Sequence, residues 1–579
     1  MGSVISAIIN RLYYRKKPSG MDKTVHIADI TGAQIAVDSP DYAKFQYQYA
    51  TSSYEDDNRM SPALLVQPKT KEDIALTLKY AKAQKIAVAV RTGGHQYCGA
   101  SSTLAPNIQL DLRSSFQSPD DLRLFNSPDG KKTFVRTSVS RSLGDFNAWM
   151  GKHQIFVPHG QCTNVHLGGH VQTGGYGQLG RSFGLFGDHV VSLEIVDHNG
   201  DFKEVTRGSD PELFYAILGG SPGNLGVITH FTIEVHRDKD YVGSRGLKAL
   251  YLYSPETLKR LLTLLATMSD NVDFPRNYDF CVSVLSSKFD LVSIFPNADD
   301  IEEEKFPKIF GKDNLKVWPR LIVVYAQWVP FSPNDKPDDN WFKAISKGSI
   351  FPHVTVKPMS QLTADWIFRN VREFDFPYVK STHVTNSTTL IKDKWPEWLT
   401  ARIDELVKPD NDCHISAQIQ NFGGKHSKFT TNADNGTSYS WRGDTTICCT
   451  LDAFYNGKAA HETAIKWHNR NEAEGLGPNG VFCKQDRRVL WGSFGEFDLD
   501  VVWKTYYETK EKYERLRAAR RKADPDGVLT PNTFCVKRWF LLGGIGMNFG
   551  AEGESSKLPY FIYLVLLSPL YLHNCVHRV

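Results

Sequence analysis

Two glycine-rich segments constrain this chain more than any other feature of its sequence. The first glycine segment spans residues 91–99 and contains His95, and the second spans residues 160–177 and contains Cys162. Glycine lets the backbone adopt positive φ angles and approach a ligand without an intervening Cβ atom. The imidazole of His95 and the thiol of Cys162 are both nucleophilic enough to bond to a cofactor. The two segments therefore predict a ligand held close to the backbone and suggest that it is covalently attached.

Size and composition describe a globular protein of more than one domain. A chain of 579 residues is too long for a single ordinary core, so we expect two or three domains. Its contents of 41% hydrophobic and 23% charged residues are typical of globular proteins. The net charge of +4 gives no reason to expect nucleic acid as a partner. We interpret the dense basic run at 515–522 as the solvated face of a helix.

The nine cysteines do not indicate a disulfide scaffold, because they are sparse and odd in number and no pair has the spacing of a metal site. Cys448 and Cys449 are adjacent in a strand-like run, so we expect their side chains on opposite faces of a strand. The glycosylation sequons at Asn386 and Asn435 would matter only in a secreted protein.

Both termini carry features that leave the cellular location open between the cytoplasm and a membrane surface. Residues 1–6 fit the N-myristoylation pattern, and a basic stretch at 11–17 follows. The apolar stretch at 558–572 contains two prolines and is shorter than the roughly 20 residues of a spanning helix, so we expect a packed or interfacial tail. The first residues do not resemble a secretory signal peptide, because no charge precedes their short apolar stretch and no clear cleavage site follows it. Weak membrane association is one alternative that these features support.

Local patterns between the two segments and beyond them predict mixed helices and strands. Thr70 and Asp73 resemble a capping box that opens a helix with Ile74, Leu78 and Ala81 on one face. Further expected elements are strands at 87–90, 107–112, 133–138 and 227–235, a helix with Leu143, Phe146 and Met150 on one face, a hairpin of strands 190–196 and 202–205 turning at Asn199-Gly200, and a helix at 211–218.

Three common ligand sites fit the glycine segments poorly. Residues 175–180 match GxGxxG, but no buried strand precedes them and further glycines follow, which argues against a Rossmann crossover. Neither segment ends in Gly-Lys-Ser/Thr, so a phosphate-binding NTPase loop is also excluded. His159, His166 and His170 form a weak candidate for a metal cluster, because no carboxylate lies near them in the sequence.

Three ordered motifs resemble one flavoenzyme family. They are Arg91-Thr-Gly-Gly-His95, the Gly160-x-Cys162-x-x-Val165-x-x-Gly168-Gly169-His170 run, and residues 212–229. They are similar to the FAD-binding core of berberine bridge enzyme-like oxidases, in the vanillyl-alcohol oxidase/p-cresol methylhydroxylase (PCMH) superfamily. Residues 506–513 and 524–532 resemble the family's C-terminal element, which folds back onto the FAD domain.

The resemblance implies an α+β fold, with a PCMH-type FAD-binding domain and an α/β substrate domain whose central antiparallel sheet roofs the flavin. The expected divisions are a lead-in at 1–57, the FAD-binding domain at 58–240, the substrate domain at 241–484, a returning segment at 485–538 and an apolar tail at 539–579.

The resemblance also implies a bicovalent FAD, linked through its 8α-methyl group to His95 and through C6 to Cys162. Only a thiolate is competent for the second bond. Val165 is the type of residue that lets dioxygen reach reduced flavin in this family, so we expect an oxidase that produces hydrogen peroxide. We expect the glycine segments to donate backbone N–H groups to the pyrophosphate as a nest rather than as a helix terminus. The residues expected to contact the cofactor are Arg91, Thr92, Gly93, Gly94, His95, Gly99, Cys162, Val165, Gly168, Gly169, His170, Gly174, Gly175, Gly177, Gly180, Asp188, Val190, Asn224, Gly226, Val227, Ile228 and Asn532.

The catalytic base cannot be taken from the family. Flavin oxidation of a C–H centre needs a protein base for the proton on the adjacent O–H or N–H group. The family's Tyr-x-Asn motif is absent from the corresponding stretch at 490–498. Glu496 is a substitute on position alone, and a solvated surface carboxylate is the alternative interpretation.

An alternating run at 414–422 suggests a substrate-facing strand. It places Ser416, Gln418 and Gln420 on one face. In the family this sheet roofs the flavin, so the polar face is expected to contact substrate, although an ordinary solvent-facing edge strand would show the same pattern. Tyr439 and Arg442 are further candidates for the substrate pocket.

These observations predict a two-electron oxidation of an alcohol, amine or activated C–H centre, with FAD as cofactor and dioxygen as acceptor. The substrate is expected to be a small molecule, either a secondary metabolite or an oligosaccharide, and the loss of Tyr-x-Asn favours the first. A membrane-associated flavoprotein with little catalysis is an alternative. We expect a monomer.

Overall fold

The computed structural model describes residues 25–46, 60–97, 99–286, 320–365, 377–386, 389–493 and 498–538. All of them belong to one compact unit, Met1–Arg538, and the unit Trp539–Val579 lies outside the described residues. The N-terminal acylation pattern and the apolar tail therefore fall on residues that are not described. Within the described part, no helix is both long and apolar enough to cross a membrane.

A four-stranded sheet carries the first glycine segment. Its order is β1 (Ala33–Ala36), β2 (Leu64–Gln67), β4 (Ile108–Asp111) and β3 (Val88–Arg91), with β2, β4 and β3 parallel. The expected capping box opens α3 (Lys71–Gln84), which connects β2 to β3 and has Ile74, Leu78 and Ala81 fully buried. The first glycine segment leaves the carboxyl end of β3, where ligands of parallel sheets bind.

A six-stranded antiparallel sheet follows. Its main path is β5 (Leu122–Asn126), β6 (Thr133–Ser138), β10 (Val227–Arg237), β8 (Val190–Val196) and β9 (Phe202–Thr206), and the short β7 (Ile155–Phe156) pairs with β10. The predicted hairpin is confirmed, since β8 and β9 turn through Gly200 at a φ of 82°. Two helices flank this region, α4 (Leu143–Lys152) and α7 (Pro211–Ile217).

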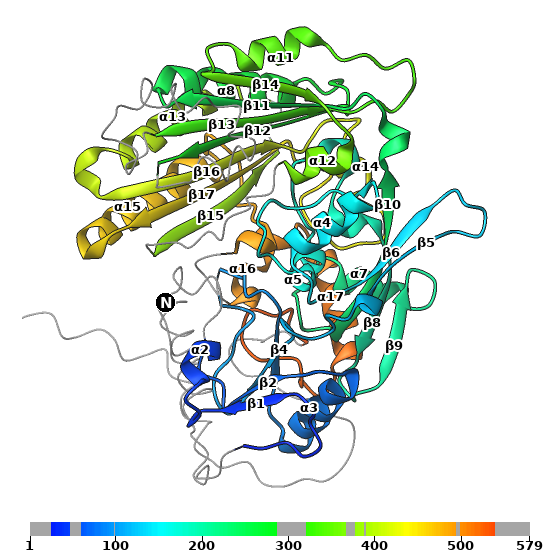
Figure 1. The fold of residues 1–579 in the computed structure, drawn as a ribbon. Helices are drawn as coiled ribbons and strands as arrows, with labels where there is room; N and C mark the ends of the chain where they lie inside the picture. Colours follow the sequence, from blue (N-terminus) through cyan, green and yellow to red (C-terminus); the bar gives the residue numbers. More distant parts are fainter. Residues whose placement is uncertain are drawn as a thin grey trace, which may run out of the picture. The chain divides into compact units, whose positions relative to one another are not determined.

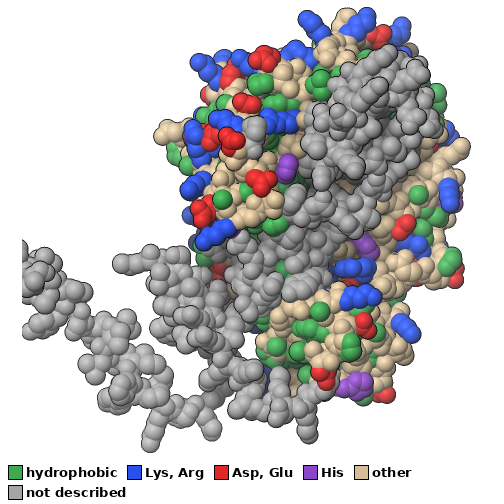
Figure 2. Space-filling model, turned by 60° about the vertical axis from the view of Figure 1, so that its left-hand side comes forward, with side chains coloured by type: hydrophobic (Ala, Val, Ile, Leu, Met, Phe, Trp, Pro, Cys, Tyr) green, Lys and Arg blue, Asp and Glu red, His purple; other side chains and the backbone are tan. Residues whose placement is uncertain are grey.

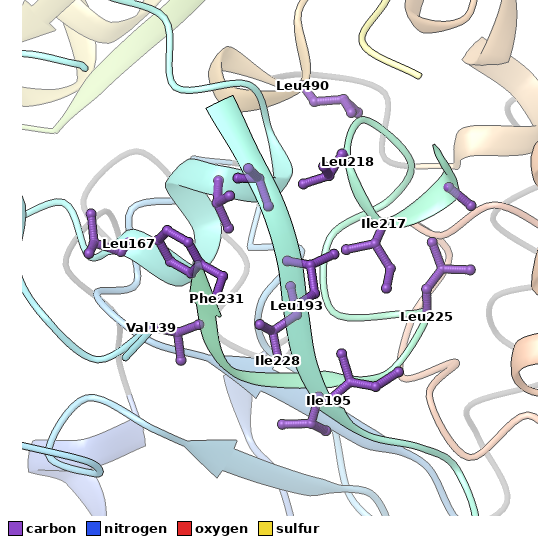
Figure 3. Packing of buried hydrophobic residues seen from close by; sticks show 14 of the residues in the cluster. Val139, Leu167, Leu193, Ile195, Ile217, Leu218, Leu225, Ile228, Phe231 and Leu490 are labelled. Carbon is purple, nitrogen blue, oxygen red and sulfur yellow. The ribbon is translucent and has the colours of Figure 1, made fainter. Parts of the chain in front are cut away.

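The core beside this sheet includes a residue from the returning segment. Figure 3 shows Leu193 and Ile195 of β8 and Ile228 and Phe231 of β10 packed together, with Leu490 in the same cluster. Further along the chain, the backbone N–H of Val88 donates to Val528 O, which places the last described residues at the edge of β3. Residues far apart in sequence thus build one core.

The third sheet has seven antiparallel strands. Their order is β14 (Phe351–Val356), β11 (Arg245–Leu252), β13 (Leu321–Trp328), β12 (Tyr278–Leu285), β16 (Cys413–Asn421), β17 (Ile447–Tyr455) and β15 (Tyr378–Thr385). Three helices, α8 (Pro255–Asp270), α13 (Trp395–Leu406) and α15 (Gly457–Gly475), share a hydrophobic cluster with one face of this sheet and lie along its outer side in Figure 1. The other face is turned toward the glycine segments. This arrangement has the mixed helices and antiparallel sheets expected of the α+β fold.

Two strands of the seven-stranded sheet answer questions raised by the sequence. Cys448 packs in the core shared with the glycine segments and Cys449 packs under the helices, so their side chains do lie on opposite faces of β17. β16 lies between β12 and β17. The interpretation of 414–422 as an edge strand is therefore wrong.

The interpretation of the basic run at 515–522 as a solvated face holds for Arg515 and Lys522 but is wrong for two other arginines. In α17 (Lys510–Ala523), Arg517 and Arg520 are fully buried. Arg520 pairs with Asp524 at 2.8 Å and donates to Leu529 O, so it holds the turn that follows the helix.

Cationic and anionic side chains are interspersed over the described part of the face drawn in Figure 2.

The second glycine segment contains a short helix. α5 (Leu167–Gln172) occupies its middle, whereas the sequence predicted a nest without a helix terminus. The GxGxxG match at 175–180 follows this helix and leads into α6 (Gly180–Phe183), a single turn. It therefore lacks both the preceding strand and the long following helix of a Rossmann crossover.

Candidate cofactor and substrate site

A cavity of about 230 Å³ lies between the two glycine segments and the polar face of the seven-stranded sheet. Its lining includes Gly93, Gly94 and His95 of the first segment and Cys162, Val165 and Gly169 of the second. The opposite wall comes from strands β12, β15, β16 and β17. The cavity thus brings together residues that the sequence assigned separately to a cofactor and to a substrate.

Arg91 anchors the start of the first glycine segment. Its buried guanidinium pairs with Asp111 of β4 at 2.8 Å and donates to the carbonyl oxygens of Phe45 and Gln46. Because the guanidinium is held by these groups, Arg91 fixes the end of β3. Gly94 follows with a φ of 69°, a conformation that a Cβ atom would strain.

The two segments meet at Gly93. A Cβ atom there would lie 3.0 Å from both Asn164 O and His166 N, so a larger residue would push the segments apart. Gly168 is similarly close to the Thr92 side chain. At Gly169, by contrast, an added Cβ would meet no heavy atom within 4 Å. Since Gly169 lines the cavity, this open space is the kind of cradle that lets a ligand approach the backbone.

His95 and Cys162 both face this cavity. Desolvation, together with the neighbouring His166, lowers the pKa of His95 to about 3, although a hydrogen bond with the backbone of Asn164 opposes the shift. The imidazole is therefore neutral at physiological pH and keeps a nucleophilic lone pair. Cys162 is partly exposed and is not in a disulfide. The imidazole of His95 and the thiol of Cys162 therefore border the same cavity.

Two further histidines at the second segment, His159 and His170, bond to protein groups around them. His170 Nε2 accepts the backbone N–H of Gly160, and His159 bonds through its two ring nitrogens to Asn147 and to Gly160 O. Desolvation lowers the pKa of His159 to about 4 and that of His170 to about 3. No group of three metal-ligating side chains occurs among the described residues.

The predicted polar face of β16 forms part of the cavity wall. Ser416, Gln418 and Gln420 line the cavity, whereas Ile415 and Ile419 pack in the helix-covered core. The side-chain amide of Gln418 donates to Gln161 Oε1, next to Cys162. This bond links the sheet to the second glycine segment.

Neighbouring strands add polar residues that the sequence reasoning missed. Ser283 of β12, Thr450 and Asp452 of β17 and Lys380 of β15 also line the cavity. The register places Asp452 opposite both Ser416 and Lys380. Alternation at Lys380-x-Thr382 and Thr450-x-Asp452 was a usable signal, but no sequence pattern indicated that these strands are neighbours.

Comparison with known proteins supports the resemblance to FAD-linked oxidoreductases. Residues 62–206, which contain both glycine segments, match the model described as an FAD binding domain. Berberine bridge enzyme-like 19 of Arabidopsis thaliana is 25% identical over 565 residues, which cover 89% of each chain. The chain thus contains an FAD binding domain and is similar to proteins named as berberine bridge enzyme-like and FAD-linked oxidoreductases.

Other similar proteins align over shorter stretches. An FAD-linked oxidoreductase of Dictyostelium discoideum is 29% identical over 306 residues, which cover 53% of this chain and 63% of that protein. The chain therefore aligns with less than two thirds of this relative's length.

Solved structures confirm the α+β fold. A glucooligosaccharide oxidase from Acremonium strictum superposes with a TM-score of 0.63 over 88% of this chain and 97% of the other, at 15% identity. That oxidase carries a 6-S-cysteinyl, 8α-N1-histidyl FAD. At this identity the likeness shows the fold alone.

The structure places Tyr439 and Arg442 away from the cavity lining. The hydroxyl of Tyr439 donates to Val171 O, and Arg442 forms a bidentate pair with Asp188. Both side chains are buried, so they support the second glycine segment and its surroundings. Neither lines the cavity, so the structure provides no support for the predicted substrate contact.

Several residues predicted to contact the cofactor also lie outside the cavity lining. Asn224 donates to Leu529 O, and Asn532 donates to the carbonyl oxygens of Ala100 and Ser102, so both tie the returning segment to the site. The remaining ones are Gly99, Gly174, Gly180, Asp188, Val190 and Val227. Glu496, the substitute base, lies outside the described residues.

Proposed function

We propose that this protein is an FAD-dependent oxidase whose flavin is bonded to His95 and Cys162. The observation that carries the proposal is that these two residues, from facing glycine segments, line one cavity. The same pair of linkages occurs in the Acremonium strictum oxidase that shares this fold.

The residues present fit a flavin nucleotide. The close approach of the segments at Gly93 and the open space beside Gly169 provide a backbone-lined cradle. Gln161 Nε2 and Trp491 Nε1 are buried donors at the cavity without a hydrogen-bond partner among the described residues. Buried donors of this kind are costly unless a ligand or water accepts from them. When bound there, FAD supplies an acceptor for a hydride and thus for two electrons.

Two residues of the second segment would act on the bound cofactor in different ways. Cys162 would attack as the thiolate, the only competent form of a cysteine. Val165 borders the cavity and is of the type that admits dioxygen in this family, which supports an oxidase that releases hydrogen peroxide.

The polar wall supports a hydroxyl-bearing small molecule as substrate. Ser416, Gln418 and Thr450 offer both donors and acceptors, and Tyr97 and Trp491 add aromatic surface. An oligosaccharide fits this description. A polar secondary metabolite also fits it, and the absence of the family's usual base from this chain favours that alternative. For a hydroxyl-bearing substrate the reaction is oxidation of an alcohol to a carbonyl compound, and for an alkaloid it is oxidation of an amine to an imine.

The test uses purified full-length holoprotein under anaerobic conditions. Cellobiose, cinnamyl alcohol and a tetrahydroisoquinoline represent sugars, alcohols and alkaloids, and bleaching of the flavin absorbance reports reduction. We expect bleaching by at least one compound, followed within seconds by recovery of colour and release of peroxide when air is admitted. Recovery over many minutes would contradict the assignment as an oxidase.

A further inference from the structure

The cavity contains a buried ion pair that the proposed cofactor linkages do not use. Lys380 Nζ lies 2.7 Å from Asp452 Oδ1, and both residues are buried, with 2% and 3% of their surface exposed. Both line the cavity. Among the described residues that form this lining, Asp452 is the only carboxylate.

Three other titratable groups of the lining are poorly suited to accept a proton. Desolvation lowers the pKa of His166 to about 4 and that of His170 to about 3. His170 also accepts the Gly160 N–H already. Burial raises the pKa of Tyr176 above its ordinary range, so its phenol stays protonated. Asp452 presents carboxylate oxygens, which can accept a proton, to the same cavity.

Stability is a weak explanation for this pair. Removing two charges from water carries a penalty of several kcal/mol per ion, and replacing a buried pair by apolar residues is often neutral or stabilising. The neighbouring rows of the sheet pack with uncharged side chains such as Thr382 and Thr450. The fold can therefore build this part of the sheet without the pair.

The pair is also joined to the first glycine segment. Lys380 Nζ lies 4.3 Å from the centre of the Tyr97 ring, two residues after His95, and 5.4 Å from the Trp491 ring. These contacts fix the ammonium between the carboxylate and the segment that carries His95. Asp452 is thus held at the boundary between the cofactor side and the sheet side of the cavity.

We propose that Asp452 is the catalytic proton acceptor of this enzyme and that Lys380 is its positioning residue, an inference that rests on the proposed oxidation. For an alcohol substrate, the O–H bond breaks and its proton passes to a carboxylate oxygen of Asp452. The electron pair of that bond becomes the second bond of the carbonyl group. The carbon gives up its hydrogen as hydride, with two electrons, to the FAD acceptor. The carboxylic acid then returns the proton to solvent.

The first experiment measures anaerobic flavin bleaching by whichever of the three compounds above bleaches the wild type fastest. Asp452→Asn is expected to bleach about 10²–10⁴-fold more slowly, the usual contribution of a general base. Asp452→Ala leaves room for a small carboxylate, so added formate is expected to restore part of its rate. Asp365→Asn is the matched control, because Asp365 also pairs with a lysine, Lys357 at 3.1 Å, but does not line the cavity.

Lys380 and Tyr97 are tested in the same assay. Lys380→Met is expected to lower the bleaching rate at saturating substrate about 10-fold or more. The substrate concentration that gives half of this rate is expected to stay nearly unchanged. Lys380→Arg is expected to retain most of the rate. Tyr97→Phe removes only the hydroxyl and is expected to stay within about 10-fold of the wild type. A loss in Tyr97→Phe as large as that in Asp452→Asn would assign the proton to the phenol and overturn the proposal, as would an unchanged rate in Asp452→Asn.

A second experiment needs no substrate. It removes both charges together, so it stays informative if the single variants fold poorly because one charge is left unpaired. The double variant Lys380→Met/Asp452→Leu is expected to keep its flavin and a Tm within about 2 °C of the wild type, or above it. A fall of more than about 5 °C would make the pair structural and contradict the catalytic role. If no compound bleaches the wild type, the proposed oxidation fails, and the double variant still decides whether the pair serves the fold.

Discussion

The guanidinium of Arg442 holds both carboxylate oxygens of Asp188, at 2.6 and 2.7 Å, although 254 positions separate the two residues in the chain. Asp188 lies just before β8, and Arg442 lies in the segment that leads into β17. Asn435 donates to the same carboxylate at 2.9 Å. The pair therefore ties the end of the glycine-rich region to the segment between two strands of the seven-stranded sheet.

Arg442→Leu is expected to lower the free energy of unfolding by about 3–5 kcal/mol, because it leaves the buried Asp188 carboxylate without its countercharge. Urea denaturation of the holoprotein measures the loss. Arg515→Ala is the control, since Arg515 pairs with Glu212 on the surface and such pairs contribute about 0–1 kcal/mol. Equal losses in the two variants would contradict the role of the buried pair.

A second prediction concerns pH. Glu194 of β8 is bonded by Arg136 and Lys71, and although desolvation opposes them, these cations lower its pKa from 4.5 to about 2. A carboxylate whose pKa is lowered by folding stabilises the folded protein fully when the pH is above its pKa in the unfolded chain. This stability is lost as the pH falls toward its pKa in the folded protein. Stability is therefore expected to fall between about pH 4.5 and 2, and less steeply in Glu194→Gln. Identical acid profiles for Tm in the two proteins would contradict this.

Two glycines offer a matched test of the cofactor cradle. A Cβ atom at either Gly169 or Gly443 would meet no protein atom within 4 Å, but only Gly169 lines the cavity. Gly169→Ala is expected to fold normally, with a gain of up to about 1 kcal/mol from its place in α5, and to carry much less flavin. Gly443→Ala is expected to keep its flavin. The ratio of flavin to protein absorbance measures both, and full flavin in Gly169→Ala would place the ligand elsewhere.

Access of dioxygen provides a fourth prediction. Val165 borders the cavity, so Val165→Leu adds a methylene group to the cavity wall. Air reoxidation of the reduced protein is expected to slow at least about 10-fold, while anaerobic bleaching changes little. Stopped-flow absorbance separates the two steps. Slowing of both together would point to a general disturbance of the site.

Local signals in the sequence predicted local structure well. The Thr70 capping box, the hairpin at Gly200 and the alternation of Ser416, Gln418 and Gln420 each depend on neighbours within a few positions, and each appears in the structure. The strand pairing that joins Lys380 to Asp452 spans 72 residues and left no pattern that a single sequence reveals.

Burial of charged residues was the other source of error. Arg517 and Arg520 looked like part of a solvated face because arginine is mostly exposed in proteins. Their burial depends on the returning segment, in which Asp524 and the carbonyl of Leu529 bind Arg520. Tyr439 and Arg442 were placed in the pocket by motif position, but their tertiary partners hold them outside its lining.

The central claim is that His95 and Cys162 each bond to FAD, and peptide mapping after acid precipitation tests it most directly. The wild-type precipitate is expected to stay yellow, and mass spectrometry is expected to find one flavin joining the peptides that contain His95 and Cys162. His95→Ala and Cys162→Ala are each expected to keep one link, and the double variant none. Release of all the flavin from the wild type into the acid supernatant would contradict the account.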